Sequence, residues 1–465
     1  MFTFQDFQDE VTNGGVAKAV AVAINSHKNS DDYKMAMDAD LYDHQKNKTI
    51  NEYVQTIFTL TGSAIEDYTA SNNKLSSNFF RRLNTQRNTY LLGNGVSFSD
   101  NEEGIKAALG DRFDTTLKRL GYYALIHGVA FGFWDVNGMH VFKLTEFVPL
   151  WDEDTGALRA GIRFWQIDSR KPMLAVLYEE DGLTKYKSDI KNGDFVEIQQ
   201  KRAYRVTISR SEADGEEVIG EDNYGSLPII PLWGSDLKQS TLVGMRALID
   251  SFDLIRSGFA NDLTDVSQIY WIVSNAGGMT DQDLAQFRDR LKLTHIAVAD
   301  TENSGVTPYT NEVPYNARQA YLESIRAGIY EDFGGLDVHT VAAGATNDHI
   351  DAAYQPMDEQ ADDYEYQIIE FVQQLLRLLG LPDSTPIFKR NRISNQYEMT
   401  QMILSSAEWL DDETVLKKLP FITIDEVSQI LEAKRQETEN RYSDDEIDRR
   451  ISALERENED EQVEV

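Results

Sequence analysis

The chain has 465 residues, 41% of them hydrophobic and 10% aromatic, and a formal net charge of −33. This length allows two to four domains with a sizeable core, and the composition is typical of a globular protein and excludes a disordered one. The acidic balance argues against a broadly basic nucleic-acid-binding face or an anionic membrane partner, although DNA that slides past without phosphate contacts remains compatible with it.

The sequence contains no cysteine, which excludes disulfide scaffolds, thiolate zinc sites and cysteine nucleophiles. The first residues, MFTFQDFQDEVTNGG, carry acids where a signal peptide carries basic residues, so no targeting segment is expected. The most apolar run, at 122–134, is far shorter than a membrane span.

The first ~110 residues are predicted to be mainly helical, because apolar residues recur at helical spacing. The clearest segments are VAKAVAVAINSH at 16–27 and NNKLSSNFFRRLNTQRNTYLLG at 72–93, and a weaker pattern surrounds Ile65–Tyr68. Gly93 and Gly95 are expected to end the second of these helices.

From Tyr122 to about Trp233 the pattern changes to strands. Flanking residues are β-branched and aromatic, and Pro228 and Pro231 are expected to end the region. Four dipeptides suited to two-residue hairpin turns punctuate it: Asn137-Gly138, Asp181-Gly182, Asn192-Gly193 and Asp214-Gly215. The sequence therefore predicts antiparallel β-hairpins within an otherwise helical protein.

Two further helices are predicted around a small module. The first covers 240–266 and would be about 40 Å long at 1.5 Å per residue. A strand–helix–strand unit follows, made of IYWIVS, a helix opened by Thr280, and THIAVAD at 294–300. The second helix covers 315–333, with Gly334-Gly335 as its stop.

A run of small residues, GGLDVHTVAAGATNDHIDAA at 334–353, separates this helix from an amphipathic one at 357–380. The last ~65 residues are predicted to be helical and become increasingly acidic. Capping-box signatures begin at Thr423 and Ser443.

The sequence contains no recognisable catalytic motif: GxxxxGK[ST], HExxH, GxSxG and a strand-linked GxGxxG are all absent. His339 and His349 have aspartates nearby, but their spacing sets no coordination geometry. Carboxylate pairs in so acidic a chain are more often solvated surface than general acid and base. We therefore predict no enzyme, no metal and no cofactor.

Basic clusters are few. In FKRNRISN, the residues Lys389, Arg390 and Arg392 form the only cluster that resembles a phosphate-facing patch. An ion-pair role is the alternative, and the residue types favour it.

Taken together, the order of elements and several segments resemble the portal proteins of long-tailed double-stranded DNA bacteriophages, in the branch typical of siphophages. The resemblance covers about residues 25 to 437, and it is specific through the order of its motifs. The segments that carry it are NNKLSSNFFRRLNTQRNTYLLGNGVSFS, YYALIHGVAFGFWDVNG, LPIIPLWGSDLKQSTLVGMRALIDSFDLIRSGFANDLTDV and NRISNQYEMTQMILSSAEWLDDETVLKKLPFITIDEVSQILEAKRQE, the last being the strongest.

The resemblance implies an α+β, mainly helical portal fold that forms a ring, usually of twelve subunits, at one capsid vertex. Double-stranded DNA would pass through its central channel. The implied parts are a wing at 1–237 that contains the β-hairpin region, a stem helix at 238–266, a clip at 267–312, a second stem helix at 313–335, a tunnel loop at 336–353, a long helix returning to the wing at 354–400, and a helical crown with an acidic tail at 401–465.

The implied partners are the large terminase subunit, head–tail adaptor proteins, the major capsid protein and the scaffold protein. The protein would be assembled in the host cytoplasm, would reside in the virion and would have no membrane partner. Residues expected to approach DNA in the tunnel loop are His339, Thr340, Ala343, Gly344, Thr346, Asn347, Asp348 and His349. Residues expected on the motor- and adaptor-docking clip are Asp281, Gln282, Asp283, Arg288, Asp300 and Asn303.

Two alternatives belong to other classes. One is an acidic hydrolase that uses carboxylates of the β region. The other is a different head–tail connector or capsid component, against which the length and the helix–module–helix order argue.

Overall fold

The structure, a computed structural model, divides the chain into two units. The first comprises Met1–Leu336 and Pro356–Asn391, and the second Asp337–Gln355 and Arg392–Val465. The residues it describes are 2–58, 63–66, 71–188, 194–211, 215–266, 270–274, 280, 282–283, 286, 305–309, 315–338, 347–392, 396–407, 409–419, 422, 424–441 and 451–452.

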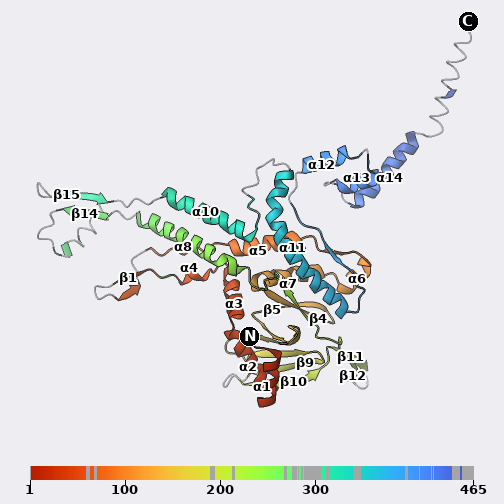
Figure 1. Cartoon of the computed structure of the whole chain (residues 1–465), viewed down its shortest axis with the longest axis horizontal. Coiled ribbons are helices and arrows are strands. Elements are labelled where there is room, and N and C mark those ends of the chain that lie inside the picture. The colour runs from red at the N-terminus through yellow and green to blue at the C-terminus, as the bar shows by residue number, and fades with distance from the viewer. Residues whose placement is uncertain are drawn as a thin grey trace, which may run out of the picture. The chain divides into compact units, whose positions relative to one another are not determined.

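The first unit begins with helices, as predicted (Figure 1). Thr3 opens the first of them with a capping box, in which its hydroxyl accepts a hydrogen bond from the Asp6 N–H at 3.1 Å. The helices are α1 (Phe4–Gly14), α2 (Val16–Asn29), α3 (Asp31–Asp43), α4 (Lys48–Glu52), α5 (Phe79–Leu92), α6 (Glu102–Leu109) and α7 (Phe113–His127). Short antiparallel pairs join β1 (Thr56–Phe58) to β2 (Ala64–Glu66), and β3 (Val96–Phe98) to β16 (Pro386–Phe388).

Three expectations for this part were wrong. The residues around Ile65 form β2 instead of a helix, and the helix expected from residue 72 begins only at Phe79. Tyr122–His127, expected as strand, form the last turns of α7. Gly128 then ends α7 with a φ of +89°, and a Cβ there would lie 2.8 Å from the backbone of Gln239.

The β region consists of antiparallel hairpins, as predicted. Turns at Asn137-Gly138 and Asp181-Gly182 join paired strands, while the turn residues 189–193 and 212–214 lie outside the described residues. The strands are β4 (Val129–Asp135), β5 (Gly138–Lys143), β6 (Phe147–Trp151), β7 (Leu158–Trp165), β8 (Leu174–Glu179), β9 (Gly182–Ser188), β10 (Phe195–Arg202), β11 (Arg205–Ser211), β12 (Gly215–Asp222) and β13 (Ile229–Trp233).

Among the described strands, one sheet has the order β10-β9-β8-β7-β6 and another the order β13-β4-β5, and β11 pairs with β12. Pro231 lies within β13, opposite Phe131. Because β13 is an edge strand, a residue without an N–H is tolerated there.

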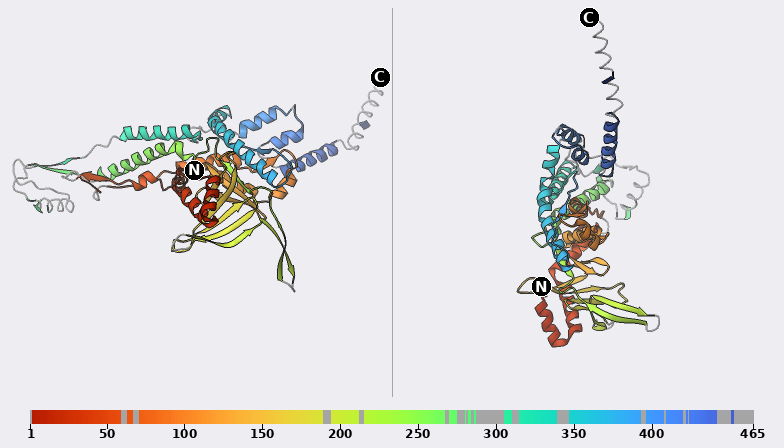
Figure 2. Two further views of the ribbon diagram at one scale, coloured as in Figure 1. Left: turned by 60° about the horizontal axis from the view of Figure 1, so that its bottom comes forward. Right: turned by 90° about the vertical axis from the view of Figure 1, so that its right-hand side faces the viewer.

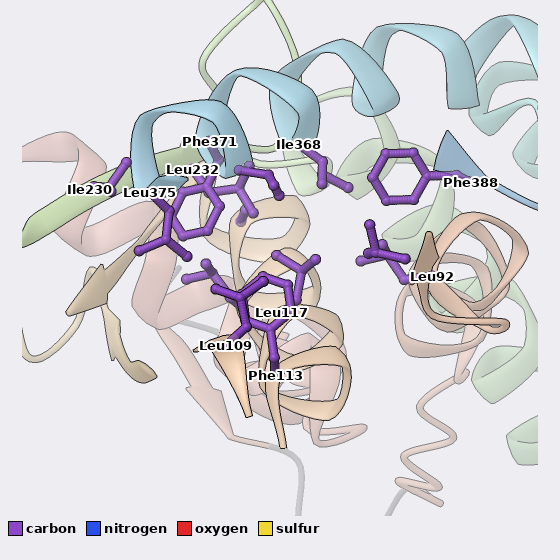
Figure 3. Packing of buried hydrophobic residues seen from close by; sticks show 14 of the residues in the cluster. Leu92, Leu109, Phe113, Leu117, Ile230, Leu232, Ile368, Phe371, Leu375 and Phe388 are labelled. Carbon is purple, nitrogen blue, oxygen red and sulfur yellow. The ribbon is translucent and has the colours of Figure 1, made fainter. Parts of the chain in front are cut away.

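A large apolar core joins α7, the strands β4 and β13, and α11 (Asn347–Leu378) (Figure 3). Phe371 of α11 is 1% exposed, and full burial of such a side chain stabilises a fold by about 1.5–3 kcal/mol. A Cβ on Gly132 of β4 would lie 2.6 Å from the Phe371 ring, so α11 packs directly on this strand. Figure 3 labels Leu92, Leu109, Phe113, Leu117, Ile230, Leu232, Ile368, Phe371, Leu375 and Phe388 of this core.

The two helices predicted around a small module are present as α8 (Leu242–Val266) and α10 (Tyr315–Phe333). Between them lies the antiparallel pair β14 (Tyr270–Ser274) and β15 (Gly305–Tyr309). The predicted second strand at 294–300 lies outside the described residues. The strand that pairs with β14 comes later in the chain than the one predicted, at Gly305–Tyr309.

In the second unit, the described helices include α12 (Gln396–Ser405), α13 (Asp412–Lys418) and α14 (Ile424–Arg441). Asp411 caps α13 by accepting a hydrogen bond from the Thr414 N–H at 3.0 Å. Val415, Leu419 and Val427 are buried. The capping signatures at Thr423 and Ser443 lie outside the described residues.

Candidate functional site

The helices α8 and α10, which the resemblance implies are the two stem helices, lie side by side and antiparallel (Figure 2). Ile325, Ile329 and Phe333 of α10 are buried. Near the other end, the rings of Phe259 and Tyr315 are 5.6 Å apart. Asp262 of α8 forms an ion pair with Arg318 of α10. Apolar contacts and the Asp262–Arg318 ion pair therefore hold the two helices together.

Three polar side chains of α8 bind the extended segment that precedes α5. The side-chain oxygens of Asp253, Ser257 and Asn261 accept hydrogen bonds from backbone N–H groups of Ser77, Leu75 and Asn73, respectively. The distances are 2.9, 3.0 and 2.6 Å.

We call this set of three bonds the polar ladder. A repeat of four residues along a helix rises about 6 Å, and two residues of an extended chain span about 6.6 Å. The two periods match, so the segment follows α8 antiparallel to it.

Asp253 is fully buried within the polar ladder, at 0% exposure. Besides the Ser77 N–H, its carboxylate accepts a hydrogen bond from the side-chain amide of Asn47. Burial raises the pKa of Asp253, while these hydrogen bonds act in the opposite direction. The polar ladder therefore contains a buried acid whose ionisation depends on the hydrogen bonds from Ser77 and Asn47.

The N-terminal half of α8 is bound to α3 and α4 by a second polar network. Arg246 lies 2.9 Å from Asp38, and the Asp250 carboxylate accepts hydrogen bonds from the hydroxyls of Thr49, at 2.6 Å, and Tyr42. Burial and the bond to Asp250 together raise the pKa of Tyr42 to about 12. The N-terminal half of α8 is thus held against α3 and α4 by these polar contacts.

The predicted basic patch is occupied by ion pairs. Arg390 pairs with three carboxylates of α11: Asp358 at 2.7 Å, Asp362, and Glu365 at 3.0 Å. Burial alone would lower the pKa of Arg390, but the bonds to Asp362, Asp358 and Glu365 outweigh it and raise the pKa. The ion-pair alternative therefore fits Arg390 better than a phosphate-facing role.

The two other residues of this patch differ from Arg390. Lys389 is exposed, and its carbonyl accepts a hydrogen bond from the Asn94 amide at 2.8 Å. In the second unit, Arg392 lies 3.0 Å from Asp351 and its guanidinium is 5.7 Å from the Tyr354 ring centroid. Only Lys389 thus remains a candidate for contact with phosphate.

The predicted tunnel-loop residues are only partly described. His339, Thr340, Ala343, Gly344 and Thr346 lie outside the described residues, whereas Asn347, Asp348 and His349 form the first turn of α11. The expected loop at 336–353 is therefore wrong for 347–353. Ile350, Tyr354 and Met357 are buried at helical spacing, and Asp348 suits the positive end of the helix dipole.

The predicted clip residues are also only partly described. Gln282 and Asp283 are exposed, and Asp281, Arg288, Asp300 and Asn303 lie outside the described residues. Asp283 accepts hydrogen bonds from the N–H of Thr280 at 2.9 Å and from its hydroxyl at 2.7 Å, and both bonds lower the pKa of Asp283. These bonds are those of a helix N-cap, which is the role expected of Thr280, whereas most of the helix expected after it lies outside the described residues.

Within the described residues, no group of three or more His, Asp or Glu side chains is placed to hold a metal ion. A helix long and apolar enough to cross a membrane is likewise not found among them. Sequence reasoning missed the polar ladder. Its signal was the placement of Asp253, Ser257 and Asn261 four residues apart in an apolar helix.

Comparisons with known proteins identify a class of structural phage proteins. The model of the family "Phage portal protein, SPP1 Gp6-like" matches residues 23–440. The chain belongs to this family of phage portal proteins.

Two relatives, each named "Portal protein", agree with the family match. The one from Clostridium phage phiCD119 is 24% identical over 411 residues, covering 81% of this chain and 88% of the relative. The one from Bacillus phage SPP1 is 25% identical over 399 residues, covering 79% of this chain and 77% of the relative. These findings favour a portal protein over a carboxylate-dependent hydrolase or another connector, and proteins of this family are virion components.

Proposed function

We propose that this portal protein assembles as a closed ring, of twelve copies, at one capsid vertex and that double-stranded DNA passes through the ring during packaging and ejection. The observation that carries the proposal is the family match over 23–440, within which α8 and α10 bracket the β14–β15 module. A pair of helices side by side, each with an apolar face against its neighbour, suits the wall of a pore.

The proposed division follows the order of the elements. It assigns 1–237 to a wing, 238–266 and 313–335 to stem helices, 267–312 to a clip, 336–346 to a tunnel loop, 347–400 to a long helix that returns to the wing, and 401–465 to a crown. In this division the polar ladder lies where the wing meets the first stem helix.

The chain's net charge of −33 supports a channel through which DNA slides. An acidic surface repels phosphates, so the duplex forms few contacts that would resist its movement. We propose that the large terminase subunit supplies the driving force and docks at the clip. Head–tail adaptor proteins would later use the same face, and the major capsid and scaffold proteins would contact the ring during assembly in the host cytoplasm.

Electron microscopy of the purified full chain tests this function. The expected images show rings with a central hole. A particle that stays monomeric at every concentration would contradict the proposal.

A further inference from the structure

The described residues 53–58, 63–66 and 71–78, called the arm from here on, carry apolar side chains that the chain itself leaves exposed. Tyr53, Val54, Ile65 and Leu75 are 42%, 44%, 48% and 37% exposed. The arm contains the β1–β2 hairpin, whose strands have three residues each. A lone two-stranded hairpin is at best marginally stable in water, so packing of this surface against another one would stabilise it.

The arm and α10 lie on opposite sides of α8. Ser257 binds the arm through the polar ladder, whereas Phe259, two residues later, contacts Tyr315 of α10. Two residues correspond to about 200° around a helix, because 3.6 residues complete one turn. Figures 1 and 2 show the same order, with α8 between α10 and the segment of α4 and β1.

The face of α10 that points away from α8 is exposed. Asn316, Ala320, Glu323 and Ala327 follow one another at spacings of four, three and four residues, and all four are exposed. Ile325 and Ile329, on the opposite face, are buried. The first unit therefore has two different exposed surfaces, the arm on one side of α8 and the outward face of α10 on the other.

A closed ring requires a heterologous interface, in which one surface of a subunit meets a different surface of the next. We propose that the arm of one copy packs on the exposed face of α10 of a second copy of this chain. This inference rests on the ring-forming function proposed above and names the surfaces that join neighbouring subunits.

The arm and the exposed face of α10 lie at the same position along the axis of α8. Leu75 is bound to Ser257, and the Arg318 guanidinium lies 5.9 Å from the Phe259 ring centroid. Because α10 runs antiparallel to α8, Ala320 lies level with Ser257 and hence with Leu75. In a ring whose axis runs along these helices, rotation from one copy to the next keeps height along the axis, so Leu75 of one copy would come level with Ala320 of the next.

Cysteine cross-linking tests this interface, since the chain has no cysteine of its own. Chains with Leu75→Cys are co-expressed with chains that carry Ala320→Cys or Ala327→Cys, and the assembled rings are mildly oxidised. Each chain then holds one thiol, so a disulfide between different positions joins two chains. The bond forms only when the two Cα atoms come within about 7 Å.

The expected result is a covalent dimer for Leu75→Cys with Ala320→Cys or Ala327→Cys. Leu75→Cys with Ile167→Cys is the control, because Ile167 is 74% exposed and lies between β7 and β8. Rings that form without either specific cross-link would overturn the interface and leave the proposed function intact. Absence of rings in the unsubstituted chain would instead overturn the proposed function.

A substitution that retains the backbone bonds provides a second test. Leu75→Glu keeps the N–H that binds Ser257 but places a charge in the proposed interface. We expect it to lower the fraction of chains in rings at least tenfold at a fixed concentration, whereas Ile167→Glu leaves that fraction unchanged. Equal ring fractions for both variants would overturn the proposal.

Discussion

Asn261 of α8 accepts a hydrogen bond from the backbone N–H of Asn73 at 2.6 Å, and this bond fixes the far end of the polar ladder. Because the donors of the polar ladder are backbone groups, these three bonds depend on the side chains of α8. The side-chain amide of Asn73 adds a further bond, to the hydroxyl of Thr264 at 3.3 Å. The first stem helix and the arm are therefore coupled through Asp253, Ser257 and Asn261.

Removing one acceptor of the ladder should loosen the arm without unfolding the rest of the first unit. For Asn261→Ala we expect amide hydrogen exchange in 71–78 to become roughly fivefold faster, since a lost hydrogen bond of this kind costs about 1 kcal/mol. Mass spectrometry of exchanged peptides measures this, with Ser251→Ala on another face of α8 as control. Unchanged exchange in 71–78 would show that the ladder does not hold the arm.

Arg390→Ala should destabilise the packing of 389–391 on α11, because Asp358, Asp362 and Glu365 would face one another without a cation. The expected loss is about 1–3 kcal/mol, seen as a lower midpoint of thermal unfolding. The matched control is its exposed neighbour in Lys389→Ala, for which the change should stay within about 0.5 kcal/mol. Similar midpoints for the two variants would contradict this role.

His27 should make stability sensitive to acid. Its ring Nε2 donates to the carbonyl of Leu144 at 2.8 Å, and burial is the main cause that lowers the pKa of His27 below 6.5. Between pH 6.5 and this lower folded-state pKa, the unfolded chain binds the proton and the folded chain does not. Stability is therefore present above pH 6.5 and is lost as the pH falls through this window.

The thermal midpoint of the unsubstituted protein should thus fall more between pH 7.5 and 5.5 than that of His27→Gln, which cannot titrate there. His44→Gln, at an exposed position, serves as control and should behave like the unsubstituted protein. If His27→Gln kept the full pH dependence, another group would have to be its source.

Deleting 340–346 should leave ring assembly intact and impair DNA packaging or retention. The deletion ends before α11 begins at Asn347, so Ile350, buried three residues into that helix, keeps its place. A packaging assay with rings of the deletion variant checks this. Normal packaging would remove the assignment of these residues to a tunnel loop.

Placing two positive charges on the proposed clip should weaken docking of the packaging motor. We expect the pair of substitutions Asp281→Lys and Gln282→Lys to reduce terminase recovery in a pull-down, and Asp154→Lys, exposed in the β6–β7 turn, to have no effect. Equal recovery with both variants would count against motor docking at this turn.

The sequence pattern was sufficient to predict the helices α8 and α10, because apolar residues recur at helical spacing over several turns of each. It failed at 72–78, where helical spacing competes with hydrogen bonds to Ser257 and its neighbours, which lie some 180 residues away. It also failed at Tyr122–His127, whose aromatic and β-branched residues suit a strand equally well until Gly128 sets the boundary.

The candidate site was predictable only in part. The ion pairs of Arg390 link residues spaced 25 to 32 positions apart, and nothing in FKRNRISN indicates that three carboxylates of α11 face it. Likewise, a run of small residues predicts a loop, but its end at Asn347 depends on the tertiary burial of Ile350 and Tyr354. The role of Arg390 and the start of α11 thus depend on contacts between residues distant in sequence, which the local sequence pattern does not show.

The mass of the purified assembly, measured by native mass spectrometry, tests the proposed twelve-copy ring most directly. A closed ring of twelve copies predicts one dominant particle at twelve times the chain mass of 52.8 kDa. A single species of 52.8 kDa at all protein concentrations would contradict it.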